Sequence, residues 1–493
     1  MLAIACLAAS TPVATAAAPA GHARMAIDGA ALLTDPLATA ERNDVVVLQP
    51  WQHDRLAALK AARPGVKVLM YKNLSSAKES NAGGIYATGI GLQWIEANHP
   101  EWLLLNPEGE RIHFRGYPNL VATDVGDPGY QAQWADNVVA ELLAAPWDGV
   151  FIDDANPTMR HHYDVGRVAK YPTDEAYSAA TESALAHIGP RVRAAGRISV
   201  ANIGSWVDYG PAASRFLDHV DGGLDESFGK WGNDPRTGYV DTTQWERQLG
   251  AVVEAERRDK LFVGVAHSQN DDAAAARYGW ATMLLGARSR SSYAFGADYT
   301  NETWFPFYDY DLGEPAGEVE PRADGVRQRR FANGVALVNP TATSRTVALD
   351  VPHSGSGYKR TRSVKLAARS ALVLVRDTAR TTQARVGAGE AADALGATGR
   401  RDVTLLRVRH DGGSRKVVVT VSCPLGSVSE TCKSRVRLFA ARGRAGKGPR
   451  SEKQVGQQVV RVPRGKSRSV SIRLSRRSAR RTRGHVVRAQ AAV

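Results

Sequence analysis

The sequence is poor in cysteine and has no long apolar run, and each shortage excludes a class of protein. Its 493 residues contain three cysteines, too few for a small disulfide-rich scaffold, and nothing in their spacing resembles a zinc site. No later run of about 20 apolar residues follows the N-terminus, so no transmembrane helix is predicted. A hydrophobic content of 43% is instead typical of a globular protein with a substantial core, and the length predicts two or three domains.

Charge of one sign is concentrated at the C-terminus. Residues 401–493 contain 24 Lys/Arg and 4 Asp/Glu, a net charge of +20, whereas the whole chain carries +14. The preceding 400 residues therefore carry −6, the difference between those two values. The basic region suits an anionic cell-wall polymer or membrane surface, or it is simply a solvated face that keeps the domain soluble. Few aromatics and no recognisable motif argue against a nucleic-acid partner.

The N-terminal segment 1–24 resembles a secretory signal. It has an apolar run and small-residue cleavage options at 14–16, although a positively charged start is missing. Cys423 and Cys432 lie nine residues apart in a strand-rich region, which favours a hairpin disulfide over two free thiols in an oxidising compartment. Both features predict a secreted or cell-surface protein.

Strand-like and helix-like segments alternate through the first 300 residues. Short β-branched, apolar runs are separated by Ala/Leu/Glu/Arg-rich stretches of helical period. The predicted strands are 44–49, 66–71, 120–125, 148–154, 197–203, 221–227, 261–267 and 291–296. Eight such units predict an α/β fold, a (β/α)8 TIM barrel over residues 25–312. A doubly wound open sheet is the alternative, but no glycine-rich nucleotide loop follows the first strand.

The pattern changes to period two after the predicted barrel. We expect a small antiparallel β domain at 313–376, because alternating runs are separated by Asn-Gly and Asn-Pro turns. Residues 377–399 are predicted as a linker, and 400–493 as a basic β-sandwich.

Polar residues gather where the predicted barrel strands end. In a barrel of this type, the active site forms at the carboxyl ends of the strands. Carboxylates, amides and aromatic rings around one rim are what a carbohydrate site needs. The candidate catalytic and substrate-binding residues are Lys72, Asn73, Asp124, Asp153, Asp154, Asn202, Glu226, Trp231, His267 and Gln269.

Two of these carboxylates fit the chemistry of glycosidic cleavage. A pair of opposed carboxyl groups cleaves the bond through an oxocarbenium-like transition state. We expect Asp153 to be the nucleophile or base and Glu226 the acid/base, with strand alternation sending Asp154 to another side. The alternatives are an Asx turn at Asp153, a structural ion pair of Glu226, and a packing role for Trp231.

The sequence resembles a family of glycosyl-hydrolase-like TIM-barrel proteins, which are predicted to be exported bacterial enzymes. The resemblance is carried by VLMYKNLSS, WDGVFIDDANP and YDYDLGEP…RRFANGVALVNPT. The resemblance spans residues 40–376 and extends distantly to endo-α-1,4-polygalactosaminidase-like and α-galactosidase-like barrels. It implies that the aspartate ending the fourth strand, here Asp153, is catalytic, and an acidic residue on the sixth strand fits Glu226. The glutamate of chitinase-like barrels is replaced by Ala155-Asn156, which argues against substrate-assisted chitin chemistry.

The sequence therefore predicts an exported glycoside hydrolase that acts on a carbohydrate polymer or oligosaccharide. Such hydrolysis needs no organic cofactor, and no catalytic metal is expected. A non-catalytic polysaccharide-binding barrel is the leading alternative, and it predicts that Asp153 and Glu226 do not converge. A third hypothesis makes the basic region 400–493 an adhesin or nucleic-acid binder carried on a barrel scaffold.

Overall fold

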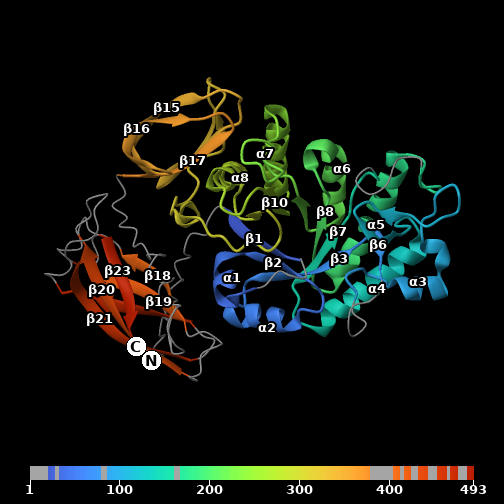
Figure 1. Cartoon of the computed structure of the whole chain (residues 1–493), viewed down its shortest axis with the longest axis horizontal. Helices are drawn as coiled ribbons and strands as arrows, with labels where there is room; N and C mark the ends of the chain where they lie inside the picture. Colours follow the sequence, from blue (N-terminus) through green and yellow to red (C-terminus); the bar gives the residue numbers. More distant parts are fainter. Residues whose placement is uncertain are drawn as a thin grey trace, which may run out of the picture.

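The computed structural model describes most of the chain. The described residues are 20–27, 33–78, 86–159, 167–377, 404–410, 416–422, 431–441, 452–463, 467–475 and 486–492. Figure 1 shows the barrel, a small β domain beside it and a C-terminal pair of sheets. Within the described residues, no helix is long and apolar enough to cross a membrane.

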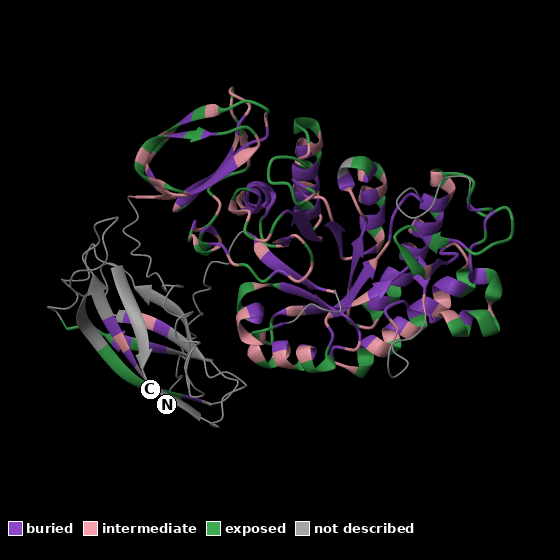
Figure 2. Cartoon of the chain, in the orientation of Figure 1, coloured by how far each residue is buried: buried purple, intermediate pink, exposed green. Residues whose placement is uncertain are grey.

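Eight parallel strands close into a barrel in the order β1-β11-β10-β9-β8-β7-β3-β2, which confirms the predicted fold class. The strands are β1 (Gly21–Ala26), β2 (Val45–Leu48), β3 (Lys67–Asn73), β7 (Gly149–Asp153), β8 (Ile198–Asn202), β9 (Gly222–Asp225), β10 (Leu261–His267) and β11 (Ser291–Gly296). The helices around them are α1 (Pro36–Arg42), α2 (His53–Ala62), α4 (Pro128–Ala144), α5 (Asp174–Ala194), α6 (Trp206–His219), α7 (Thr242–Arg257) and α8 (Ala273–Gly286). Figure 2 shows buried strands surrounded by helices whose outer faces are exposed.

Strand alternation divides the barrel core into two layers. In β7, Phe151 joins an apolar cluster inside the barrel, whereas Val150 and Ile152 pack in the cluster between strands and helices. Because successive side chains point to opposite faces, Asp153 continues the inner row at the end of this strand. The phase of β7 therefore directs the first aspartate of the pair to the barrel axis.

One predicted barrel strand is wrong. Residues 120–125 overlap β6 (Tyr117–Ala122), which pairs antiparallel with β4 (Ser76–Ala77) and β5 (His113–Phe114) outside the barrel. A buried apolar run looks the same in a small sheet as in a barrel, so composition alone did not separate them. Helix α3 (Leu92–Asn98) and the 3₁₀ helix η2 (Pro100–Trp102) belong to the same insertion.

The barrel strand that the prediction missed is β1, which begins inside the segment predicted as signal-like. Its sequence, GHARMA, has no β-branched residue. Ala23 and Met25 face the inner cluster, and alternation sends His22 and Arg24 outward. There, His22 stacks on Trp280 of α8 with ring centroids 4.3 Å apart. A polar outward face is why hydropathy did not mark this strand.

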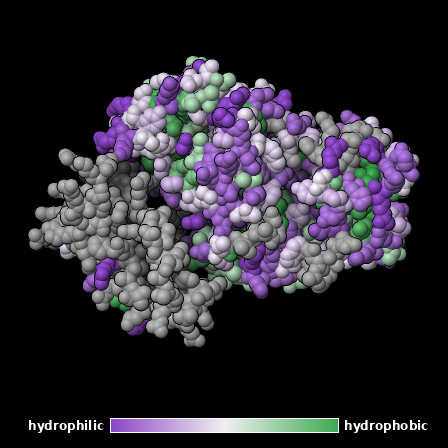
Figure 3. All heavy atoms as spheres, viewed as in Figure 1, coloured by the Kyte–Doolittle hydropathy of each residue, from purple (hydrophilic) through white to green (hydrophobic). Residues whose placement is uncertain are grey.

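The small β domain packs against α8 as an extension of the barrel core. Its antiparallel sheet has the order β12-β13-β14-β17-β15-β16, with strands β12 (Glu320–Pro321), β13 (Arg327–Phe331), β14 (Gly334–Asn339), β15 (Arg345–Gly355), β16 (Tyr358–Leu366) and β17 (Ser370–Arg376). Val338 and Val373 belong to the same apolar cluster as the barrel helices. The buried Arg329 donates to the Leu284 carbonyl at 3.0 Å. Figure 3 shows hydrophilic residues mixed with apolar ones on the visible face of both domains.

The C-terminal region contains two three-stranded sheets, β18-β19-β22 and β21-β20-β23. The strands are β18 (Thr404–His410), β19 (Lys416–Ser422), β20 (Thr431–Ala441), β21 (Glu452–Pro463), β22 (Ser467–Arg473) and β23 (Val486–Ala492). Alternate apolar residues, such as Val436 and Leu438, are buried, as in a sandwich. The predicted linker, apart from Asp377, lies outside the residues that the structure describes. The predicted Cys423–Cys432 disulfide also lies outside them, because Cys423 is not described.

Candidate active site

Inward-facing polar residues converge where β3, β7, β8 and β9 end. Asn73 of β3 is in register with Asp153 of β7, so both side chains leave the barrel at one level. Asn202 ends β8, and Glu226 follows directly after β9. The parallel barrel thus brings together residues up to 153 positions apart, from Asn73 to Glu226.

Asp153 receives a hydrogen bond on each carboxylate oxygen. The Tyr71 hydroxyl donates to Oδ2 at 2.5 Å, and the Asn202 Nδ2 donates to Oδ1 at 2.8 Å. Burial raises the pKa of Asp153 to about 7, and the nearby charges of Asp154 and Glu226 add to this rise. The two donors oppose the shift, because they stabilise the ionised form. Asp153 is therefore an unusually basic carboxylate.

Glu226 lies beside Asp153 and shares a donor with it. The same Asn202 Nδ2 donates to Glu226 Oε2 at 3.2 Å, and the Tyr299 hydroxyl donates to the other oxygen. The two bonded carboxylate oxygens therefore cannot be farther apart than the sum of 2.8 and 3.2 Å, which is 6.0 Å. If each amide N–H serves one oxygen, their separation is about 5 Å. The predicted convergence of Asp153 and Glu226 is present.

Asp154 begins the loop that follows β7. Its φ of 54° lies in the left-handed region, which a non-glycine residue adopts only when its surroundings hold it there. Asn73 donates to Asp154 Oδ2 at 2.5 Å, and the Ser75 hydroxyl donates to its backbone carbonyl at 3.0 Å. Asp154 and Asn73 thus fix the chain as it leaves β7.

Three aromatic rings form one side of the site. The His267 ring, at the end of β10, lies 4.2 Å from the Trp231 ring and 5.7 Å from the Tyr299 ring, measured between centroids. Burial lowers the pKa of His267, and the Glu226 charge partly offsets this effect. Trp231 keeps 51% of its surface exposed despite this contact. An exposed indole that contacts His267 is suited to the flat face of a sugar ring.

Two predicted site residues are held by contacts outside this cluster. Lys72 faces the helix layer, where its fully buried ammonium contacts Glu141 of α4 at 2.7 Å. Asp124 follows β6 in the insertion and is bonded by Lys170 and Tyr171. Gln269 is exposed two residues beyond the end of β10, and its assignment to the site stays a prediction. Residues one position out of phase, or on a strand outside the barrel, cannot reach the axis.

Two tyrosines of the site were not assigned from the sequence. Tyr71 occupies the inward position two residues before Asn73, and Tyr299 comes from the loop after β11. Burial raises the pKa of both hydroxyls well above the usual tyrosine value, so both remain hydrogen-bond donors at neutral pH. The inward phase of β3 was available as a signal for Tyr71, whereas Tyr299 depends on a loop conformation.

Among the residues described, no cluster of three or more His, Cys, Asp or Glu side chains could hold a metal ion.

Comparison with known proteins identifies a family. The model of the family described as hypothetical glycosyl hydrolase family 15 matches residues 60–335, more than half of the chain. No curated protein matches the chain significantly. Many solved structures show remote similarity to the chain, and three enzymes among them have TM-scores below 0.5. They are an Anoxybacillus α-amylase (9% identity, 72% of this chain, 96% of that chain, TM-score 0.41), the cycloalternan-degrading enzyme from Trueperella pyogenes (12%, 73%, 62%, 0.42) and the maltogenic α-amylase AmyB from Thermotoga neapolitana (12%, 72%, 98%, 0.39).

Proposed function

The chain belongs to hypothetical glycosyl hydrolase family 15 and is thus a glycoside hydrolase, and from this premise we propose that Asp153 and Glu226 are its catalytic pair. The substrate class is a polysaccharide or oligosaccharide with O-glycosidic bonds. The observation that supports this pair is the single Asn202 amide that donates to both carboxylates. A binding protein has no need to hold two carboxylates this close, because their mutual repulsion has to be offset.

A retaining mechanism fits the separation of the pair. Retaining enzymes place their carboxyl groups about 5–5.5 Å apart, whereas inverting enzymes leave about 6.5–9.5 Å for a water molecule. The 6.0 Å limit on the two oxygens bonded to Asn202 favours the first geometry. Ionised Asp153 attacks the anomeric carbon while the bond between that carbon and the leaving oxygen breaks. Glu226 gives its proton to the leaving oxygen. Glu226 then takes a proton from water, which displaces Asp153 and restores both groups.

The surrounding residues support these two roles. Tyr71 and Asn202 donate to Asp153, which keeps its carboxylate oriented with one face toward the site. Asp154 is held by Asn73, so we assign it to shaping the loop and to bonding a sugar hydroxyl. Trp231 and His267 provide the aromatic side of the subsite, with Trp231 as a ring platform.

Export and attachment to an anionic surface are further parts of the proposal. Secretion is supported by the apolar, small-residue N-terminus. Attachment to an acidic cell-wall polymer is supported by the net charge of +20 over residues 401–493.

The experiment is a screen of polysaccharides for the release of new reducing ends, followed by NMR of the first product anomer. The wild-type chain should release ends with retention of configuration. Asp153→Asn and Glu226→Gln should each lower kcat at least about 10³-fold on unactivated substrates, because each removes one half of the pair.

Asp234→Asn is the matched control, since Asp234 is an exposed carboxylate that pairs with Arg236 on the loop bearing Trp231. It should retain wild-type activity. Substrate binding without cleavage by the wild type, unchanged in Asp153→Asn, would instead identify a polysaccharide-binding barrel. First release of the opposite anomer would replace the retaining mechanism by an inverting one.

A further inference from the structure

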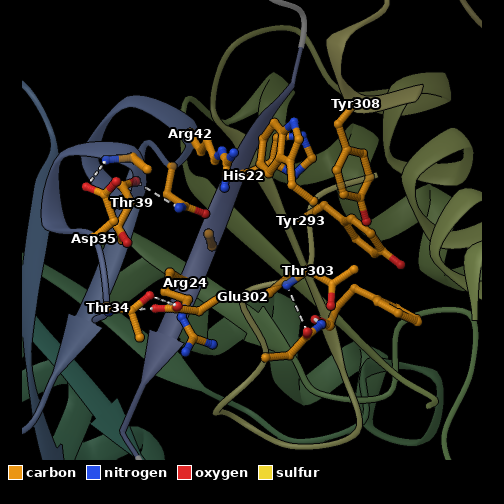
Figure 4. Close-up of a pocket in the computed structure, with 17 residues that line it drawn as sticks. His22, Arg24, Thr34, Asp35, Thr39, Arg42, Tyr293, Glu302, Thr303 and Tyr308 are labelled. Carbon is orange, nitrogen blue, oxygen red and sulfur yellow. Dashed lines mark hydrogen bonds between the residues drawn. The ribbon is translucent and has the colours of Figure 1, made fainter. Parts of the chain in front are cut away.

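Asp225 is a buried carboxylate that the proposed mechanism does not use. It ends β9, and because Leu224 joins the inner cluster, strand alternation directs Asp225 outward to the helices. Another buried charge of that outer layer, Arg24 of β1, lies beside Glu302 at the edge of a cavity of about 310 Å³ (Figure 4). Among the described residues, no Lys, Arg or His side chain is bonded to Asp225. The burial of this carboxylate therefore needs an explanation other than an ion pair.

The Asp225 carboxylate is bonded to the turn that carries Glu226. Its Oδ1 accepts from the Ser227 amide at 3.1 Å, and its Oδ2 accepts from Nε2 of Gln248 in α7 at 3.0 Å. Burial raises the pKa of Asp225 to about 7, and both donors oppose this rise because they favour the ionised form. Asp225 thus connects the start of the turn to α7.

Gln248 bonds the same turn at two further points. Its side chain is fully buried, like that of Asp225. Its Oε1 accepts from the Gly229 amide at 2.8 Å, and its Nε2 also donates to the Ser227 carbonyl at 2.9 Å. One amide side chain of α7 therefore contacts the Asp225 carboxylate and both backbone groups that follow Glu226 at Ser227 and Gly229.

Every backbone N–H from Glu226 to Gly229 has an acceptor. The Glu226 amide donates to the Gly204 carbonyl at 3.1 Å, and the Phe228 amide donates to the Val265 carbonyl at 2.9 Å. The other two acceptors are the side chains of Asp225 and Gln248. Backbone acceptors are present with any sequence, whereas these two depend on the residue type. A displacement of about 1 Å at a reacting group can cost about 10²-fold in rate, so the hold on this turn matters for Glu226.

We propose that Asp225 and Gln248 are positioning residues for Glu226, which hold the turn 225–229 so that the Glu226 carboxylate stays beside Asp153. This inference rests on the proposed role of Glu226 as the acid/base. Both side chains are buried, so neither is placed to touch the substrate. Their loss should therefore lower kcat and leave KM nearly unchanged.

Kinetics of Asp225→Asn on a cleaved polysaccharide test this inference. The substitution keeps the size of the side chain but places an NH₂ group against a donor, either the Gln248 Nε2 or the Ser227 amide. With one bond to the turn lost, kcat should fall about 10- to 100-fold while KM stays within about twofold of the wild-type value. Adding Gln248→Glu restores a donor and acceptor pair between the two positions and an acceptor for the Gly229 amide. The double variant should regain at least about fivefold in kcat, since the two residues act as a unit.

Thr282→Val is the matched control for a general loosening of α7. It removes the buried hydrogen bond from Trp245 Nε1 of α7 to Thr282 Oγ1 of α8, which measures 2.9 Å and lies away from the turn. The Tm should fall, because a buried donor is left without a partner, and kcat should stay at the wild-type value. An equal loss of kcat in Thr282→Val and Asp225→Asn would overturn the inference.

Amide hydrogen exchange at Ser227 and Gly229 tests the hold on the turn without any substrate. Asp225→Asn should accelerate exchange at one or both amides about tenfold or more beyond any change in Thr282→Val. Unchanged exchange, or a wild-type kcat in Asp225→Asn, would overturn the inference. Failure of the proposed function shows separately, as cleavage that survives in Glu226→Gln, because the exchange measurement does not depend on cleavage.

Discussion

At the scale of single residues, the proton on Asp153 controls the proposed reaction. Its pKa is raised to about 7 by burial and by the neighbouring carboxylates, so the free enzyme holds a neutral Asp153 at low pH. A nucleophile must be ionised, and kcat/KM should therefore fall about tenfold per pH unit below pH 7. The measurement is the pH profile of kcat/KM on a cleaved oligosaccharide.

Tyr71→Phe sharpens this test, because it removes a donor that lowers the pKa of Asp153. The low-pH limb should move up by about one unit, the value of one hydrogen bond to a charged group. Tyr299→Phe is the matched comparison, since it removes the equivalent donor from Glu226. If kcat/KM instead falls as the pH rises through 7, Asp153 is the proton donor and Glu226 is the nucleophile.

The convergence of Asp153 and Glu226 could be predicted from the sequence, because each residue ends or directly follows a strand with a clear sequence pattern. Whether the other site residues could be predicted depends on their phase in a strand or on the conformation of a loop. Lys72 sits between two inward residues and was assigned to the rim, although alternation sends it toward α4. Tyr299 could not be predicted, because its contact with Glu226 depends on how the loop after β11 folds back.

At the scale of elements, Lys72 attaches α4 to β3 through Glu141. The Lys72 ammonium is fully buried, while the Glu141 side chain is 32% exposed. Glu141→Ala should lower the free energy of unfolding by about 2 kcal/mol or more, because it leaves a buried charge unpaired. Lys72→Met should be far milder, since it removes that charge and fills the same space. Urea denaturation measures both.

Activity measurements on Lys72→Met decide between a structural and a substrate-binding Lys72. Folded Lys72→Met should retain the wild-type KM, because the Lys72 ammonium is bonded to the Tyr86 carbonyl and to Glu141 of α4 and not to the carboxylate cluster. A KM raised tenfold with unchanged stability would instead return Lys72 to the substrate site.

The element pattern was also only partly readable. Seven of the eight predicted strands coincide with barrel strands, because apolar runs buried on both faces are distinctive. Strand β1 was missed, since its outward residues are Arg24 and His22, which stacks on Trp280 of α8. Strand β6 of the insertion was predicted as the eighth barrel strand in place of β1. The missed strand is thus one whose outward side chains are polar.

At the scale of the whole molecule, the barrel and the small β domain share hydrogen bonds and an apolar cluster, and we expect them to unfold together. Arg277 of α8 donates to the Ala371 carbonyl at 2.8 Å, and Arg329 reaches back to the end of the same helix. The two domains also share an apolar cluster. A chain truncated before residue 320 would expose that cluster, whereas one ending at Asp377 leaves it intact.

A chain ending at Asp377 should therefore keep the Tm and kcat/KM of the full chain. It should lose binding to an anionic polymer, because residues 401–493 carry the net charge of +20. Binding by the full chain should weaken steeply as salt rises, since screening acts on exposed charges. Co-sedimentation with an anionic and with a neutral cell-wall polymer, over a salt series, measures this. Equal retention of both chains on the anionic polymer would place the attachment surface on the barrel, and the basic sandwich would then be only a solubilising domain.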